Sequence, residues 1–264
     1  MTRWAVTARK DGDLVCPQFD SAMLFPPKDI SGYKPTVGMT KEVIVTKRFV
    51  FSNSAVAALR DKYTDSTDED SPLQPTRVEV LSVFIWTRFA DSTEVESGPK
   101  RNHTVIHAVN LHPRMDPPLP EHSFGNLYWF VMAIPSMDSG DESRGLVRQM
   151  REMKQSVDGD FVTKVQEGSE HLNFITEHGQ KFIKGEVVSF NFTSLCRLPL
   201  YETDFGWGRP VRMGSVRLPF KNLVTFMETG KGDGIEAGIH LEQEETAKFE
   251  AEKELLAYIA TTYE

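Results

Sequence analysis

The sequence has few cysteines: only Cys16 and Cys196 occur in 264 residues. That number excludes a scaffold held together by several disulfides and favours a reducing compartment. The first residues form no secretory apolar region, so we expect a cytoplasmic protein. No hydrophobic run approaches the roughly 18 residues that cross a bilayer, and we therefore expect no membrane partner.

Basic charge is also scarce. The chain has 30 lysines and arginines against 38 acidic residues, a formal net charge of -8, and no stripe rich in lysine and arginine. Such a protein is a poor candidate for binding nucleic acid, because phosphate contacts need clustered cations. The acidic run from Asp61 to Asp70 is typical of a solvated loop.

Several common site motifs are missing. There is no nucleophile-elbow serine, and neither cysteine lies in a convincing nucleophile motif. His103 and His107 have the spacing of metal ligands on a helix, but the β-branched residues between them predict a strand, and we expect no metal site. The glycine-rich segment 230–234 has strand patterns on both sides. It therefore predicts a hairpin turn, whereas a phosphate loop leads into a helix.

Strand and helix patterns alternate along the chain, and a hydrophobic content of 39% can bury a sizeable core. Residues 1–40 are rich in proline and short on periodicity, which predicts an extended linker before a domain at 41–264. The patterns indicate an α/β protein with a mixed sheet and flanking helices. Predicted strands cover 42–51, 103–110, 127–134 (a central strand), 187–193, 223–229 and 235–241, and predicted helices cover 54–63, 77–89, 145–157 and 245–263.

The most unusual segment is Asp204-Phe205-Gly206-Trp207-Gly208. Two glycines flank an indole, so the backbone can bend sharply beside a ring that we expect to be buried. The carboxylate of a buried aspartate needs a cationic or amide partner. On composition alone, the segment predicts a well-packed structural turn.

This string resembles the C-terminal motif of the BAHD acyltransferases, plant enzymes that move an acyl group from coenzyme A to an alcohol or amine. Other segments match in order and most resemble the vinorine-synthase-like branch. They are Pro17–Asp20, Lys47–Phe51, Pro75–Glu79, Val109–Leu111, Pro117–Pro120, Thr193-Ser194 and Gly232–Gly234. The resemblance implies a chloramphenicol-acetyltransferase-like fold of two similar domains. This chain would hold the linker at 1–40 and the second domain at 41–264, with strands that complete the first.

The resemblance also implies a reaction. An acyl-CoA co-substrate, not a permanently bound cofactor, would acylate a small-molecule alcohol or amine of a plant natural product. Family members carry their general base in a His-x-x-x-Asp motif upstream of the part matched here, so this chain lacks it. His112 and Asp116 fit that pattern by letter. We reject them as catalytic, because Asp116 precedes two prolines that favour extended backbone.

The alternative function is non-catalytic. Without the general base, the chain would be a truncated remnant that binds coenzyme A or acceptor, or that pairs with another chain. The sequence fixes neither the acyl donor, the acceptor nor the oligomeric state.

Three candidate sites follow from the resemblance. Thr193 would donate a hydrogen bond to the tetrahedral oxyanion, although the residues alone equally allow a strand threonine satisfied by its neighbours. Asp204 would form a structural ion pair with Arg114. Thr76 and Arg77 begin a predicted buried helix whose N-terminus could meet a coenzyme A phosphate, and a plain helix cap is the alternative.

Overall fold

A mixed six-stranded sheet organises the part of the chain that the structure describes, which is residues 2–10, 16–27, 42–64, 74–93, 102–135, 142–168, 187–216 and 218–260 of a computed structural model. The strand order is β1-β6-β5-β4-β2-β3. Strand β4 is parallel to both β2 and β5, and the other neighbours are antiparallel. The strands are β1 Ile44–Ser52, β2 Asn102–Asn110, β3 Tyr128–Ala133, β4 Val187–Ser194, β5 Leu223–Glu228 and β6 Gly234–Glu242.

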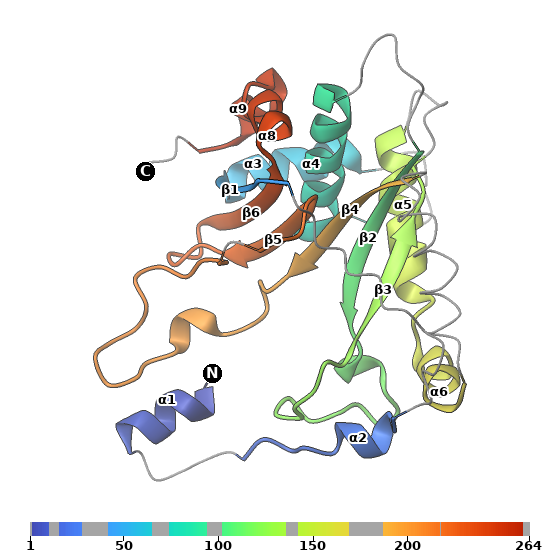
Figure 1. The fold of residues 1–264 in the computed structure, drawn as a ribbon, viewed down its shortest axis with the longest axis vertical. Helices are drawn as coiled ribbons and strands as arrows, with labels where there is room; N and C mark the ends of the chain where they lie inside the picture. The colour runs from blue at the N-terminus through green and yellow to red at the C-terminus, as the bar shows by residue number, and fades with distance from the viewer. Residues whose placement is uncertain are drawn as a thin grey trace.

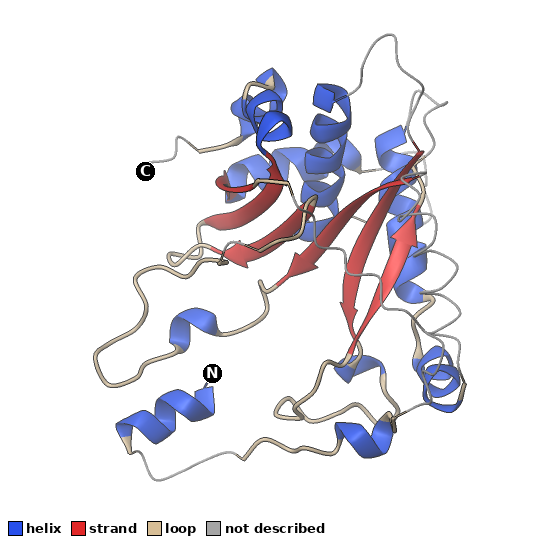
Figure 2. Ribbon diagram, in the orientation of Figure 1, coloured by secondary structure: helices blue, strands red, loops and turns tan. Residues whose placement is uncertain are grey.

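Helices gather on one face of this sheet (Figures 1 and 2). They are α3 Asn53–Tyr63, α4 Arg77–Thr93, α5 Glu142–Gln155, α8 Gln243–Glu250 and α9 Lys253–Tyr258. The remaining helices of the described residues are α1 Thr2–Arg9, α2 Ser21–Leu24 and α6 Gly159–Glu167, with short 3-10 turns η1 His112–Arg114 and η2 Leu200–Glu202. The predicted α/β class with a mixed sheet is confirmed.

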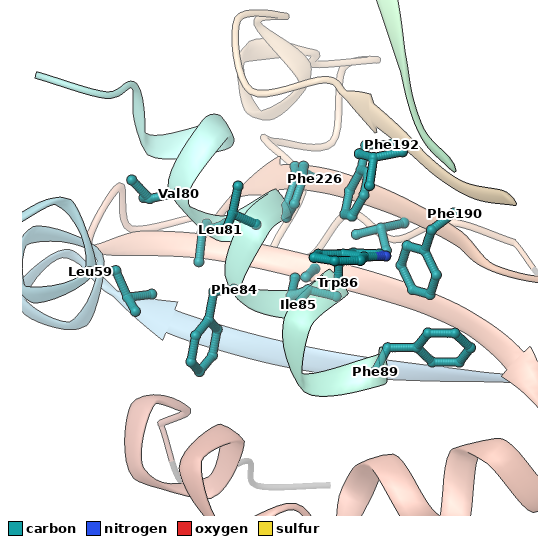
Figure 3. Close-up of a cluster of buried hydrophobic side chains, with 14 of the residues drawn as sticks. Leu59, Val80, Leu81, Phe84, Ile85, Trp86, Phe89, Phe190, Phe192 and Phe226 are labelled. Atoms are coloured by element: carbon teal, nitrogen blue, oxygen red, sulfur yellow. The ribbon is translucent and has the colours of Figure 1, made fainter. Parts of the chain in front are cut away.

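Helix α4 lies at the centre of the core. Its apolar residues go all the way round, as its sequence predicts, and Trp86 and Phe89 are almost completely buried. Phe89 packs against Phe190 of β4, with ring centroids 4.7 Å apart (Figure 3). Phe190 and Phe192 face the helices. Because side chains alternate along a strand, the residue after Phe192 faces the opposite side of the sheet.

The run at 127–134 forms an edge strand, not the predicted central one. Strand β3 pairs with β2 alone in the described part of the chain. Its residues alternate between the helical face, where Val131 and Ala133 are buried, and the other face, where Tyr128 and Phe130 are 47% and 43% exposed. A continuous apolar run therefore indicates a strand with apolar side chains on both faces, and here one of those faces is partly exposed.

The first predicted segment is not extended throughout. Residues 2–9 contain neither proline nor glycine and form α1. Ala5 of α1 is buried at 1% exposure. The prediction of extended chain is therefore wrong at α1 and at the single turn of α2, while residues 11–15 and 28–41 lie outside the described residues.

The predicted C-terminal helix is broken in two. Helix α8 ends at Glu250, and the carboxylate of Glu252 accepts from the Leu255 N–H to begin α9. The chain then becomes extended, and Ile259 pairs with Phe51 at the edge of β1. Across the described ranges, no helix is long and apolar enough to cross a bilayer.

Candidate functional site

Thr193 lies one residue before the end of β4, on the sheet face opposite the helices. It is half-buried and pairs with Thr225 of the parallel strand β5. Neither hydroxyl has a hydrogen-bond partner among the described residues. The Thr193 hydroxyl therefore lies beside a second threonine hydroxyl, and no described neighbour satisfies it. Its role as an oxyanion donor stays a prediction.

The N-terminus of α4 is a reciprocal helix cap. The Glu79 N–H donates to Thr76 Oγ1 at 3.2 Å, and the Thr76 N–H donates back to Glu79 Oε2 at 2.9 Å. Arg77 forms an ion pair with Glu228 of β5 at 2.7 Å. Both predicted phosphate contacts thus have partners within the chain, and an incoming phosphate would have to displace Glu228. The coenzyme A role of Thr76 and Arg77 stays a prediction.

Glu79 also anchors a charged cluster between α4 and α5. It is 4% exposed, and its carboxylate lies 3.3 Å from Arg151 Nη2 and 3.6 Å from Lys154 Nζ. Burial alone would raise the pKa of Glu79, but Lys154, the Thr76 N–H and Arg151 outweigh it and lower that pKa. Burial lowers the pKa of Lys154. The cluster joins the two helices behind the sheet and holds an ionised carboxylate in the core.

The two spaced histidines lie on a strand, as predicted. His107 on β2 is 3% exposed and stacks on Phe192 at 5.1 Å, and burial lowers its pKa well below the usual value. His103 packs against Trp86. Within the described ranges, no three His, Cys, Asp or Glu side chains gather in a way that could hold a metal ion.

The glycine-rich segment forms the predicted hairpin. It joins β5 to β6, and Gly232 has a φ of +69°. The Thr229 hydroxyl donates to Asp233 Oδ1 at 2.6 Å and accepts from the Asp233 N–H at 3.1 Å. These contacts leave the segment as a turn between strands, without the helix start that a phosphate loop requires.

The segment from Asp204 to Gly208 is a tight turn that packs against α1. Asp204 Oδ1 accepts from the N–H groups of Gly206 at 2.7 Å and Gly208 at 3.0 Å, which lower the pKa of its carboxyl. Both glycines have positive φ, 108° and 103°. The sharp bend predicted from the two glycines is confirmed.

The aromatic residues of this turn face α1 and solvent. The Phe205 ring meets Trp4 of α1 edge-on at 5.1 Å and stacks on Trp207 at 5.7 Å. Arg9 donates to the Asp204 carbonyl. Trp207 is 84% exposed. The expectation of a buried indole is therefore wrong, because the turn projects the ring away from the core.

The described residues contain no ion pair between Asp204 and Arg114, so that prediction is wrong. Arg114 Nη1 donates instead to the carbonyls of Lys154, at 2.6 Å, and Val157. Arg114 thus ties η1 to the C-terminal end of α5, where helix carbonyls lack intrahelical donors. The two residues act in separate clamps, Asp204 in its own turn and Arg114 at a helix end.

His112 lies in η1 with both ring nitrogens engaged. Nδ1 is 2.7 Å from Asn110 Oδ1, and Nε2 is 3.0 Å from the Ser123 carbonyl. The ring therefore links β2 to the loop before β3. This geometry agrees with rejecting His112 as the general base, since a base needs a nitrogen free to take a proton from substrate.

Thr225 is the residue that the sequence did not single out. The alternation of side chains along β5 predicts only the face of the sheet on which Thr225 lies. Its adjacency to Thr193 depends on the register between two strands whose paired residues lie 32 positions apart in the sequence, Asn191 pairing with Leu223. Local pattern does not encode that register.

The sequence and the fold of this chain are similar to those of known proteins. A family model described as the transferase family matches residues 1–256. A limonoid 21-O-acetyltransferase from Melia azedarach is 34% identical over 97% of this chain and 59% of its own length. Vinorine synthase from Rauvolfia serpentina is 31% identical over 96% of the chain and 57% of its own length.

Solved structures have the same fold. The crystal structure of vinorine synthase superposes with a TM-score of 0.74 and 29% identity, covering 98% of this chain and 58% of that one. TRI101 from F. sporotrichioides, solved with coenzyme A and T-2, gives a TM-score of 0.69 at 17% identity, over 97% of this chain and 61% of that one. The chain spans less than two thirds of the length of these relatives. With a family model over nearly all of its residues and relatives above 30% identity, the chain belongs to the transferase family of BAHD acyltransferases.

Proposed function

We propose that this chain takes part in transferring an acyl group from acyl-CoA to an alcohol or amine of a plant natural product. Its relatives include a limonoid 21-O-acetyltransferase, a stemmadenine O-acetyltransferase and vinorine synthase. Acyl-CoA serves as co-substrate, and a small-molecule alcohol is the acceptor. Residues 41–264 form the second acyltransferase domain, which works in the cytoplasm.

The observation that carries the proposal is the hydroxyl of Thr193, near the end of β4, which has no hydrogen-bond partner among the described residues. Acyl transfer passes through a tetrahedral oxyanion, and a positioned donor for that oxygen supplies about 2.7–4 kcal/mol of transition-state stabilisation. Thr193 lies on the sheet face opposite the helices that form the core among the described residues, and it is half-buried there. A hydroxyl held there can meet a thioester carbonyl without breaking any hydrogen bond found among the described residues.

A second candidate function is non-catalytic binding of coenzyme A or acceptor, or pairing with another chain. His112 favours it, because the histidine that fits the family's base motif by letter has both ring nitrogens engaged. Loss of a positioned general base costs about 10²–10⁴ in rate. Turnover by these 264 residues alone would then be slow even with substrates bound.

The test is incubation of the purified chain with acetyl-CoA and a panel of plant alcohols and amines. Release of coenzyme A thiol and acetylated product are measured together, so that simple thioester hydrolysis is recognised. Acceptor-dependent transfer supports the enzyme and discredits the remnant. Acetyl-CoA binding by calorimetry without transfer favours the second candidate, and neither binding nor transfer contradicts both.

Thr193→Val is the informative variant, since valine keeps the shape and removes the hydroxyl. We expect a fall of about 10²-fold in the transfer rate, the loss typical of one oxyanion donor. His112→Gln is the matched control, because its ring links β2 to the loop before β3 and takes no proton in this scheme. If the transfer rate falls equally in both variants while their stability is unchanged, the assignment of Thr193 as the oxyanion donor is wrong.

A further inference from the structure

Thr193 has a close neighbour of the same chemistry. Thr225 is its direct partner across the parallel pair β4–β5. Neighbouring strands lie about 4.8 Å apart, and side chains at paired positions stand on the same face. Both threonines follow this rule, since Phe192 and Phe226 beside them point into the helical core. Two hydroxyls at this separation can converge on one oxygen atom placed between them.

In the part of the chain that the structure describes, neither hydroxyl takes part in a hydrogen bond. Thr225 is only 5% exposed. The Thr225 oxygen is not among the fully buried side-chain oxygens that lack a partner in the described residues, so it is not a buried polar group left unsatisfied.

A glycine lies beside Thr225 in the same row, and Ser215 packs against it. The next position across the sheet is Gly238 of β6, which has no side chain. A Cβ built there would meet Thr225 O at 3.8 Å and Ser215 Cβ at 3.9 Å, both ordinary contact distances. The row of paired residues across β6, β5 and β4 is therefore Gly238, which has no side chain, followed by Thr225 and Thr193, which each have a small hydroxyl side chain.

The two strands are held rigidly behind this row. The Phe192 and Phe226 rings stack at 5.9 Å with an interplanar angle of 8°, and both are at most 2% exposed. Each ring belongs to the residue next to one of the threonines. Donors fixed in this way cost little reorganisation when charge develops on a bound oxygen.

We propose that Thr225 is a second hydroxyl donor to the thioester carbonyl oxygen, acting together with Thr193. This inference rests on the proposed function. In the step it assists, the acceptor oxygen bonds to the carbonyl carbon and the carbonyl electron pair moves onto the oxygen that both threonines bind. That pair returns as the carbon–sulfur bond breaks, and coenzyme A leaves as a thiol that carries the acceptor's proton.

The test uses the full chain and acetyl-CoA labelled with carbon-13 at the carbonyl. The infrared carbonyl stretch of the bound thioester reports hydrogen bonding to that oxygen, and calorimetry gives the affinity. In Thr225→Val, we expect the downshift seen in the wild type to shrink while the dissociation constant changes by less than about twofold. Thr225→Ser should restore the downshift, because serine keeps the hydroxyl.

Thr104→Val is the matched control. Thr104 is a buried threonine of β2, opposite Ser189 at the far end of β4 from Thr193. It should leave the stretch unchanged. A Thr225→Val spectrum identical to wild type overturns the inference and leaves the proposed function standing, whereas a wild-type chain that does not bind acetyl-CoA overturns both. Melting temperatures separate either result from misfolding, since loss of an unpartnered hydroxyl should not lower them.

Discussion

Replacement of Glu79 by glutamine tests the charged cluster between α4 and α5. Glutamine keeps the size and an oxygen acceptor for the Thr76 N–H, so the helix cap at 2.9 Å is retained. What is lost is the negative charge facing Arg151 and Lys154. The variant therefore isolates the ionic part of the cluster from its capping part.

The magnitude follows from burial and distance. Leaving a buried charge unpaired costs about 3–5 kcal/mol, while exposed pairs are worth about 0–1 kcal/mol. The Arg151 and Lys154 side chains keep 17% and 19% of their exposure, and their distances of 3.3 and 3.6 Å exceed those of strong charge-assisted bonds. We expect a loss of about 2–3 kcal/mol, which lowers Tm by about 4–12 °C.

The direction in which the stabilisation by Glu79 changes with pH follows from its pKa. The folded-state pKa of Glu79 is lowered, so its stabilisation is present above the unfolded pKa of about 4.3 and is lost as pH falls through the folded pKa. Thermal melts of wild type and Glu79→Gln should therefore differ near pH 7 and converge in acid. Glu228→Gln is the control, because its pair with Arg77 is 40–42% exposed and should contribute little. A Glu79→Gln difference that is no larger than the control's, or that persists in acid, would refute this reasoning.

Three further results are expected. Gly234→Ala places a Cβ 2.3 Å from a backbone oxygen of β1 and should cost at least about 1–3 kcal/mol in chemical denaturation, whereas Gly214→Ala, with nothing within 4 Å, should cost much less; equal effects would contradict the packing. Asp204→Ala and Arg114→Met should be additive within about 0.5 kcal/mol in a double-mutant cycle, because the two side chains do not pair, and a larger coupling would restore the ion pair. Burial raises the pKa of Tyr63 to about 12, so the tyrosine that ionises at the highest pH in the wild type should be missing from the ultraviolet titration of Tyr63→Phe. The stability of the wild type should fall as pH rises from about 10 towards 12. If Tyr63 instead ionises together with the other tyrosines, its burial would be contradicted.

Local patterns predicted most elements because period and composition act over a few residues. Helix α4 illustrates this, since apolar residues all round it required burial on every side, and Trp86 is 2% exposed. The hairpin around Gly232 likewise followed from glycines between two strand patterns. These features depend on neighbours in sequence, which a single chain displays directly.

The wrong predictions depend on neighbours in space. Whether Phe130 is covered depends on what lies beside the sheet edge, and Trp207 is exposed because its turn points away from the core. The partner of Arg114 is a helix end, not the aspartate that family resemblance suggested. The pairing of Thr193 with Thr225 needed strand register, which arises from the tertiary fold.

Hydrogen exchange of the chain with and without acetyl-CoA tests most directly whether the sheet face that carries Thr193 and Thr225 holds the thioester. Peptides that contain the end of β4 and the paired part of β5, around Thr193 and Thr225, are predicted to gain protection on addition of acetyl-CoA. Protection confined to the loop around His112, or no change anywhere in the chain, would contradict the account.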